Sequence, residues 1–192
     1  MSGTSRQVVL ALGSNLGDRL ARIQAGIDQL AAAPGLRLAA VSAIFETAPV
    51  GGPAQPDYLN AVLLGDSDLP ASSILGYCQA AERALGRVRN EHWGPRTLDV
   101  DLIACDDEVS SDPVLTLPHP RAHLRAFVLA PWLDVDPAAH LVGFGSVADL
   151  LAKADRTGVT RLAGARLEVP KARGVRGVAP PQASTDVVPA QE

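Results

Sequence analysis

The sequence predicts an α+β fold in which one mainly antiparallel sheet carries helices on both faces. Three observations support this: apolar runs of strand character, segments with apolar residues at helical spacing, and the order of the two. That order is strand, helix, strand, strand, helix, strand, followed by a helical extension. It is typical of a split βαβ, ferredoxin-like domain. A chain of 192 residues is long enough for one such domain with a sizeable core.

The first strand and the first helix follow directly from the apolar pattern. Residues 8–12 form an apolar run typical of a buried strand, and the small and turn-forming residues 13–18 end it. The next segment repeats apolar residues at helical spacing, at Leu20, Ile23, Ile27 and Leu30. Pro34 and Gly35 predict the end of this helix.

Two further strands and a second helix lead to the last strand of this unit. Strands are expected over 36–47 and 58–66. The proline- and glycine-rich loop between them, 48–57, is long for a hairpin and is therefore a candidate to fold over a ligand. The helix is expected over 70–85, with Gly86 as its C-terminal stop.

The last part of the chain predicts a helical extension and a tail. After a short strand around 114–117, we expect a helix with apolar residues at Leu124, Val128 and Trp132. A last helix is expected over 147–154, capped by Ser146. The composition then loses its periodicity, which divides the chain into a domain at 1–165 and a disordered or loosely packed tail at 166–192.

The composition argues against several classes of protein. A net charge of −4 leaves no general basic footprint for nucleic acid. No apolar stretch approaches the length that crosses a bilayer, and the first residues lack the apolar core of a signal peptide. Cys78 and Cys105 lie in apolar patterns without metal-ligand spacing, as reduced core thiols do. We expect a cytoplasmic protein, and a monomer, that binds neither nucleic acid nor membranes.

The most informative segment is Arg-Thr-Leu-Asp-Val-Asp at residues 96–101. Because strand side chains alternate, Asp99 and Asp101 share one face about 6.6 Å apart, while Val100 between them faces the opposite layer. Two such carboxylates raise each other's pKa unless positive charge lies between them. Mg²⁺ removes this conflict and completes its coordination with water and phosphate oxygens. The segment therefore predicts a magnesium site for a nucleotide polyphosphate; the alternative is a solvated strand face.

Basic and aromatic residues gather beside these acids. Arg87, Arg89 and Arg96 lie in or next to the polar loop that enters the strand, and guanidinium groups match phosphate oxygens in a bidentate way. Trp93 lies in the same loop, where an indole is exposed unless it covers a ligand ring. His119, held between two prolines, is suited to donate to phosphate. The alternative is an ordinary solvated basic loop.

Two weaker patterns leave a structural and a ligand-binding role open. The turn 13–17 has features of a phosphate cradle but lacks the spacing and the lysine of a Walker motif, so a structural turn is the simpler interpretation. Tyr58 and Asn60 share one strand face and pair an aromatic ring with an amide, as a heterocycle site requires. Such residues also occur in ordinary cores and at sheet edges.

A set of short motifs is spread over about residues 8–135. They are LGSN at 12–15, Thr47, QPDYLN at 55–60, GRVR at 86–89, WGPRTLDVD at 93–101, LPH at 117–119 and RAF at 125–127. In content and order they resemble the 6-hydroxymethyl-7,8-dihydropterin pyrophosphokinase family of folate biosynthesis. The resemblance implies transfer of the β,γ-diphosphate of ATP to the hydroxymethyl oxygen of the pterin, release of AMP, and use of two Mg²⁺ ions.

The same resemblance implies roles for individual residues. The metal ligands are Asp99 and Asp101, which form the catalytic set together with Arg87 and Arg96. The implied nucleotide site comprises Gln79, Glu82, Arg89, Trp93, Arg96, Leu102, Thr116, His119 and Arg125. The implied pterin site comprises Thr47, Ala48, Val50, Tyr58, Asn60, Trp93, Asp99 and Phe127. In that site Tyr58 and Phe127 enclose the ring, and Asn60 binds its polar edge.

Two other functions fit part of the sequence. A metal-dependent phosphohydrolase also uses paired aspartates beside arginines, and it differs by releasing free phosphate. A ferredoxin-like module that binds RNA is the other hypothesis. The net acidity of the chain and the lack of a basic, aromatic sheet face argue against it.

Overall fold

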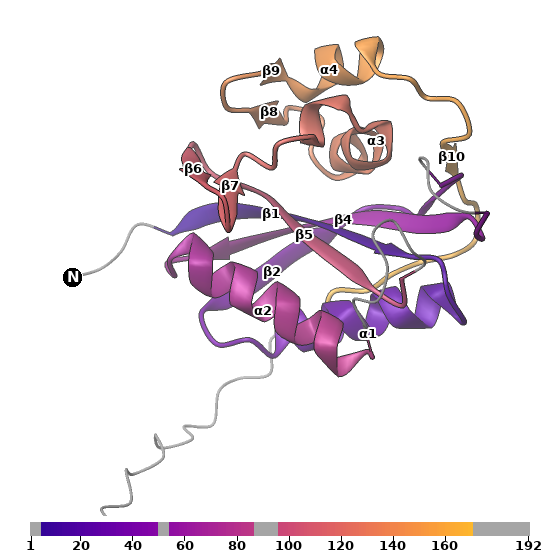
Figure 1. The fold of residues 1–192 in the computed structure, drawn as a ribbon, viewed down its shortest axis with the longest axis horizontal. Helices are drawn as coiled ribbons and strands as arrows, with labels where there is room; N and C mark the ends of the chain where they lie inside the picture. The colour runs from indigo at the N-terminus through magenta and orange to yellow at the C-terminus, as the bar shows by residue number, and fades with distance from the viewer. Residues whose placement is uncertain (1–4, 50–53, 87–95, 171–192) are drawn as a thin grey trace, which may run out of the picture.

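A computed structural model of the chain describes residues 5–49, 54–86 and 96–170. The α-helices in these ranges are α1 (Arg19–Ala31), α2 (Ala71–Ala84), α3 (Ala126–Val135) and α4 (Val147–Lys153). The helices α1 and α2 cover one face of a six-stranded sheet, while α3 lies on the other face with α4 beyond it (Figure 1). The predicted α+β fold with helices on both faces is confirmed.

The sheet is antiparallel throughout, in the order β10-β3-β4-β1-β5, and β2 also pairs with β4. Its strands are β1 (Arg6–Ser14), β2 (Leu36–Val41), β3 (Phe45–Thr47), β4 (Tyr58–Ser67), β5 (Asp99–Cys105) and β10 (Thr160–Arg161). Two small hairpins pair β6 (Ser110–Asp112) with β7 (Leu115–Leu117) and β8 (His140–Leu141) with β9 (Gly145–Ser146). The first strand thus lies between the third and the last strands of the βαββαβ unit, as a split βαβ domain requires.

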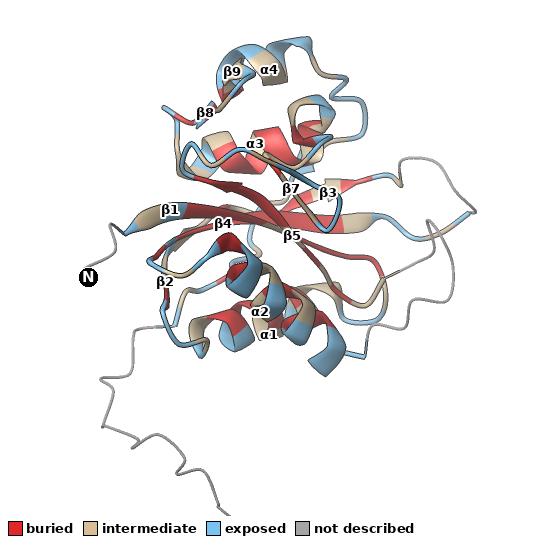
Figure 2. Cartoon of the chain, turned by 60° about the vertical axis from the view of Figure 1, so that its left-hand side comes forward, coloured by how far each residue is buried: buried red, intermediate tan, exposed pale blue. Residues whose placement is uncertain are grey.

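Alternation along the central strands divides the buried core into two halves, one on each face of the sheet (Figure 2). On β5, Val100 and Leu102 enter the half covered by α1 and α2, whereas Ile103 belongs to the half covered by α3. Asp99 and Asp101 open onto the α3 side of the sheet, where they line a cavity. The predicted separation of the two acids from the apolar residues that alternate with them is confirmed.

The single strand expected over 36–47 is in fact two strands. Both β2 and β3 pair with β4, and residues 42–44 between them leave the ladder. Ser42 lies at this break: its N–H donates to the Val62 carbonyl (2.9 Å), and its hydroxyl accepts from the Val62 N–H (2.9 Å). The Ser42 hydroxyl therefore takes the place of a backbone carbonyl as the acceptor for Val62. The pattern of apolar residues does not show such a contact.

The helix expected through Leu124 begins only after it. A 3₁₀ turn, Ala122–Leu124, is followed by Arg125 in an extended conformation (φ −103°, ψ 98°), and α3 starts at the next residue. Val128 and Trp132 are buried as predicted, but Leu124 is 66% exposed. The prediction for Leu124 is wrong because the extended residue breaks the helical repeat that would have placed it above Val128.

Local signals predicted two helix boundaries correctly, whereas the short strands β6, β8, β9 and β10 were not predicted. Gly86 has φ +76° and ends α2, and Ser146 caps α4 by accepting from the Asp149 N–H (3.4 Å). Cys78 and Cys105 are both buried. None of the helices within the described ranges is long and apolar enough to span a membrane.

The described structure continues past residue 165, where the domain was expected to end. Leu167 is 8% exposed in the core half under α1 and α2. Gln24 on α1 donates to the Glu168 carbonyl and accepts from its N–H, both at 2.9 Å. Residues 166–170 therefore pack onto the domain, and the remainder of the expected tail, 171–192, lies outside the described residues.

Candidate active site

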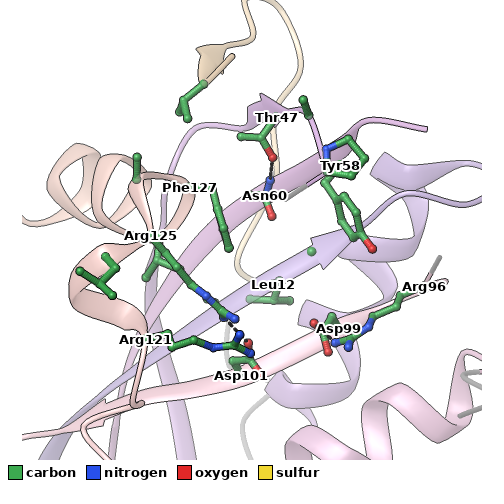
Figure 3. A pocket seen from close by; sticks show the side chains of 18 of the residues that line it. Leu12, Thr47, Tyr58, Asn60, Arg96, Asp99, Asp101, Arg121, Arg125 and Phe127 are labelled. Carbon is green, nitrogen blue, oxygen red and sulfur yellow. Dashed lines mark hydrogen bonds and ion pairs between the residues drawn. The ribbon is translucent and has the colours of Figure 1, made fainter. Parts of the chain in front are cut away.

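A cavity of about 470 Å³ opens on the α3 side of the sheet (Figure 3). The strands β1, β4 and β5 contribute its floor, and β3 and the beginning of α3 contribute to its walls. The predicted site residues that line it are Thr47, Ala48, Tyr58, Asn60, Arg96, Asp99, Asp101, Arg125 and Phe127. Folding thus brings together residues from four separate stretches of sequence.

Small residues on the central strand make room for this cavity. Gly13 of β1 pairs with Asn60 on one side and with Asp99 on the other, so these three residues form one row across the sheet. A Cβ atom at Gly13 would lie 3.1 Å from Asn60 Oδ1. Ala11 occupies the next row between Val62 and Asp101. The floor is therefore open between the amide on β4 and the acids on β5.

The two acids of the floor each face an arginine. Asp99 forms an ion pair with Arg96, and Asp101 Oδ2 lies 3.6 Å from Arg125 Nη1. Burial opposes the charge on Arg96, but the neighbouring Asp99 carboxylate raises the pKa of Arg96 overall. Burial lowers the pKa of Arg125, and Asp101 works against this effect. The guanidinium groups thus supply part of the positive charge that two neighbouring carboxylates require.

His119 lies beside the acid end of the cavity. Its backbone N–H donates to the Ile103 carbonyl (2.9 Å), and its ring Nε2 is 3.9 Å from Asp101 Oδ2. Burial, together with the positive charges of Arg125 and Arg121, lowers the pKa of His119 to about 4. The imidazole is therefore neutral at neutral pH, and its approach to Asp101 is not an ion pair.

This pKa predicts how His119 affects the pH dependence of stability. The pKa of His119 is about 4 in the folded protein, against an ordinary value of 6.5. The neutral ring therefore stabilises the fold fully above pH 6.5, and this stabilisation is lost as pH falls toward 4. Between pH 7 and 4.5 the free energy of unfolding should fall in the wild-type protein. In His119→Gln this fall should be smaller by about 2 kcal/mol. Urea unfolding at several pH values measures this, with the exposed His140→Gln as control. Equal pH slopes in wild type and His119→Gln would contradict it.

Asn15, only 1% exposed, links its own turn to two segments that reach the cavity, at Gln55 and at Arg96. Its Nδ2 donates to Gln55 Oε1 (2.9 Å) and to the Pro56 carbonyl (3.1 Å), and its Oδ1 accepts from the Arg96 N–H (2.7 Å). The Gln55 oxygen also accepts from the Tyr58 hydroxyl (3.3 Å). These contacts favour the structural interpretation of the turn 13–17 over a phosphate cradle.

The other end of the cavity suits a planar heterocycle. Asn60 Nδ2 donates to Thr47 Oγ1 at 2.8 Å, and both residues are buried. Tyr58 and Phe127 bring aromatic rings to the same cavity, and the Arg125 guanidinium carbon lies 5.4 Å from the Phe127 ring centre. Figure 3 shows Thr47 and Asn60 away from the end that holds Asp101 and Arg125. The cavity therefore holds the buried Asn60–Thr47 pair at one end and acids and arginines at the other, with the Phe127 ring next to Arg125.

Glu82, implied in the nucleotide site, lies on the opposite side of β5 and does not line the cavity. Glu82 is only 4% exposed, and its carboxylate oxygen Oε1 accepts from the backbone N–H of Val100 at 2.9 Å. Val100 is the residue between Asp99 and Asp101. Glu82 thus holds the backbone that carries both acids.

We expect Glu82→Ala to lower the free energy of unfolding by about 2 kcal/mol, because it leaves a buried N–H without its charged acceptor. The loss should reduce turnover as well, since the strand segment between the acids is released. Urea unfolding and a turnover assay measure both effects. The control is Arg83→Ala, which removes the neighbouring, exposed charged side chain on α2. A Glu82→Ala protein as stable as that control would argue against this role.

The remaining predicted residues do not line the cavity or lie outside the described residues. Gln79 is half-buried on α2, and Leu102 is buried in the core half under α1 and α2. Thr116 lies on β7, where its hydroxyl donates to the Asp112 carbonyl (3.0 Å). The predicted residues outside the described ranges are Val50, Arg87, Arg89 and Trp93.

The cavity also contains residues that the sequence did not predict. Arg121 lines its acid end, and its place two residues after His119 was a signal for it. Asp155, Thr157 and Val159 line the cavity from the segment after α4. No motif predicted this segment. Its position depends on the pairing of β10 with β3, two strands that are far apart in the sequence.

Comparison with known proteins identifies relatives across most of this chain. The model of the family described as 7,8-dihydro-6-hydroxymethylpterin-pyrophosphokinase (HPPK) matches residues 9–137. The 2-amino-4-hydroxy-6-hydroxymethyldihydropteridine pyrophosphokinase of Mycobacterium tuberculosis H37Rv is 50% identical over 149 residues, which cover 72% of this chain and 77% of that protein. The protein of the same name from Mycobacterium leprae is 44% identical over 191 residues, covering 91% and 97% respectively.

A solved structure agrees with the fold. The crystal structure of a Plasmodium falciparum HPPK-DHPS triple mutant with pteroate matches with a TM-score of 0.59 at 14% identity. The match covers 79% of this chain and 44% of that chain. With the family match over residues 9–137 and named relatives at 44% and 50% identity, the chain belongs to the 7,8-dihydro-6-hydroxymethylpterin-pyrophosphokinase family.

Proposed function

We propose that this protein transfers diphosphate from ATP to the hydroxymethyl group of 6-hydroxymethyl-7,8-dihydropterin, giving AMP and the pterin diphosphate in folate biosynthesis. The observation that carries the proposal is the division of one cavity into two ends. Thr47, Asn60 and the aromatic rings suit the pterin, and Asp99 and Asp101 with their arginines suit the triphosphate. Family membership supports the same reaction.

The donor set of the acid end fits magnesium. At the acid end of the cavity two carboxylates, Asp99 and Asp101, lie on one face of β5. Mg²⁺ takes one or two protein carboxylates and fills its other positions with water and phosphate oxygens. Asp99 and Asp101 are therefore the residues that would hold it, and we infer two ions from the family resemblance. When bound, Mg²⁺ neutralises phosphate charge.

The protein's own residues act mainly by positioning and charge stabilisation. Thr47 keeps the Asn60 amide oriented, and that amide binds the polar edge of the ring. Arg96 and Arg125 stabilise negative charge on the phosphates. With the ring fixed at one end and the triphosphate at the other, the hydroxymethyl oxygen forms a bond to the β-phosphorus as the bond from that phosphorus to the α,β-bridging oxygen breaks. AMP leaves with the bridging oxygen, and the hydroxyl proton is released to water.

Further residues extend this assignment on the nucleotide side. We assign Arg121, which lines the acid end, to the phosphates as well. The family resemblance adds Arg87, Arg89 and Trp93 to the nucleotide side and Val50 to the pterin side. His119 suits a phosphate contact as a neutral donor, since its pKa is lowered to about 4.

The test of this function is the identity of the products. Incubation with ATP, Mg²⁺ and 6-hydroxymethyl-7,8-dihydropterin should give AMP and the pterin diphosphate in equal amounts by chromatography, and excess EDTA should abolish both. A phosphohydrolase would instead release free phosphate from ATP without the pterin. That result would replace the proposed activity with the rival one.

Binding to RNA is the alternative from another class of function. Helices cover both faces of the sheet in the described part of the chain, whereas a ferredoxin-like RNA-binding module uses an open sheet face (Figure 1).

We propose that the protein acts as a cytoplasmic monomer on small molecules. Light scattering coupled to size-exclusion chromatography should give a mass near 20.0 kDa.

A further inference from the structure

We propose that residues 155–159, which follow α4, form one wall of the pterin subsite and limit the size of the ring system that it accepts. This proposal rests on the function proposed above. Asp155, Thr157 and Val159 line the same cavity as Thr47 and Asn60. The segment lies beyond residues 9–137, the part of the chain that the family model matches.

Strand pairing brings this wall to the pterin end of the cavity. The strand β10 is antiparallel to β3, and Thr160 is the partner of Glu46. The paired residues end at Thr160, and extending the antiparallel register by one step places Val159 opposite Thr47. Thr47 is the residue whose hydroxyl accepts from the Asn60 amide. Val159 therefore stands beside the group that orients the predicted ring-binding amide.

The wall is held by its own turn. Asp155 Oδ1 accepts from the Thr157 N–H (2.9 Å), and the Val159 N–H donates to the Arg156 carbonyl (3.1 Å). Gly158 has φ +73°, which favours glycine at this position. A Cβ at Gly158 would lie 3.8 Å from Ala48 Cβ, so the turn approaches the lining residue that follows Thr47.

The wall is also anchored to the rest of the domain just after the turn. The Leu162 N–H donates to the Ile44 carbonyl (2.8 Å). Arg161 Nη2 lies 3.1 Å from Asp134 Oδ1, and the other oxygen of Asp134 accepts from the Ala43 N–H (2.7 Å). These contacts tie the residues after the turn to Ile44, just before β3, and to Asp134 near the end of α3. A wall that is held in this way resists displacement by a bulky ligand.

The decisive variant is Val159→Phe, which fills space at the Thr47 end without touching the acids. We expect it to raise the Kd for 6-hydroxymethyl-7,8-dihydropterin at least about tenfold, because overpacking of a closely fitted site is unfavourable. The Kd for a non-hydrolysable ATP analogue should stay within about twofold. Calorimetry measures both constants, with the pterin titrated in the presence of saturating analogue and Mg²⁺. Thr160→Phe is the matched control, since the neighbouring side chain is exposed and does not line the cavity.

The outcomes separate this proposal from the function on which it rests. A wild-type protein that binds no pterin contradicts the proposed function. Wild-type binding combined with an unchanged pterin Kd in a folded Val159→Phe protein overturns the wall alone. If circular dichroism shows that Val159→Phe is unfolded, Val159→Ala decides: loss of the apolar wall should weaken pterin binding about threefold, and unchanged binding overturns the proposal.

Discussion

Asp101→Ala is expected to lower kcat for AMP formation by about a thousandfold, with the fold intact. The carboxylate lies on the cavity floor beside Arg125, and its side chain is 35% exposed. The side chain is not part of the buried core, but its removal takes away one of the two carboxylates that we propose to hold Mg²⁺. Asp99→Ala should have a comparable effect for the same reason.

Steady-state kinetics with AMP detection measures this loss, and circular dichroism with thermal unfolding checks the fold. Asp66→Ala is the matched control, because Asp66 is an exposed carboxylate on β4 of the same sheet. The control should keep wild-type turnover. Near-normal AMP formation by Asp101→Ala would falsify the assignment of the acid pair as the metal and phosphate site.

Asn60→Ala is expected to raise the Kd for the pterin by about fiftyfold while changing the Kd for the nucleotide little. Asn60 is buried, its amide donates to Thr47 Oγ1 at 2.8 Å, and its Oδ1 lies next to Gly13 on the floor. Truncation removes the group that we propose to bind the polar edge of the ring, and it leaves the Thr47 hydroxyl without its donor. A site that is built to hydrogen-bond its substrate loses much when one partner is missing.

Thr47→Val tests whether the pair works as a unit. It should weaken pterin binding less, by about tenfold, because Asn60 stays in place but loses the acceptor that orients it. In the double variant the two effects should not add, since both remove the same oriented amide. Calorimetry of pterin binding measures the cycle, with Asp66→Ala again as control. Full additivity, or an equal loss of nucleotide affinity, would show that the two residues do not form a pterin site.

Much of the fold was predictable because its signals are local. The period of two along β5 places Asp99 and Asp101 together on the α3 side, and the structure confirms this separation. Gly86 and Ser146 end and begin helices through their own backbone and side-chain properties. The strand break at Ser42 was missed, because it depends on a hydroxyl contact with Val62, which is far away in the sequence.

The site was predictable to a lesser extent. Motif resemblance pointed to residues such as Asn60 and Phe127, which the fold does bring to one cavity. It could not show that Glu82 and Leu102 lie on the other side of β5, where Glu82 holds the strand backbone and Leu102 fills the core. Arg121 was missed although it stands close to a predicted histidine.

By itself, the sequence determined the βαββαβ order of the main unit, the common face of the two acids and the family to which the chain belongs. The first two properties depend on the spacing of side chains along the chain, and the family depends on the content and order of its sequence motifs. Only the tertiary structure decided that Gly13 opens the floor between Asn60 and Asp99, and that residues 155–159 reach the cavity. The physical reason is that both depend on which strands pair and in which register, and pairing joins residues that are far apart in the chain.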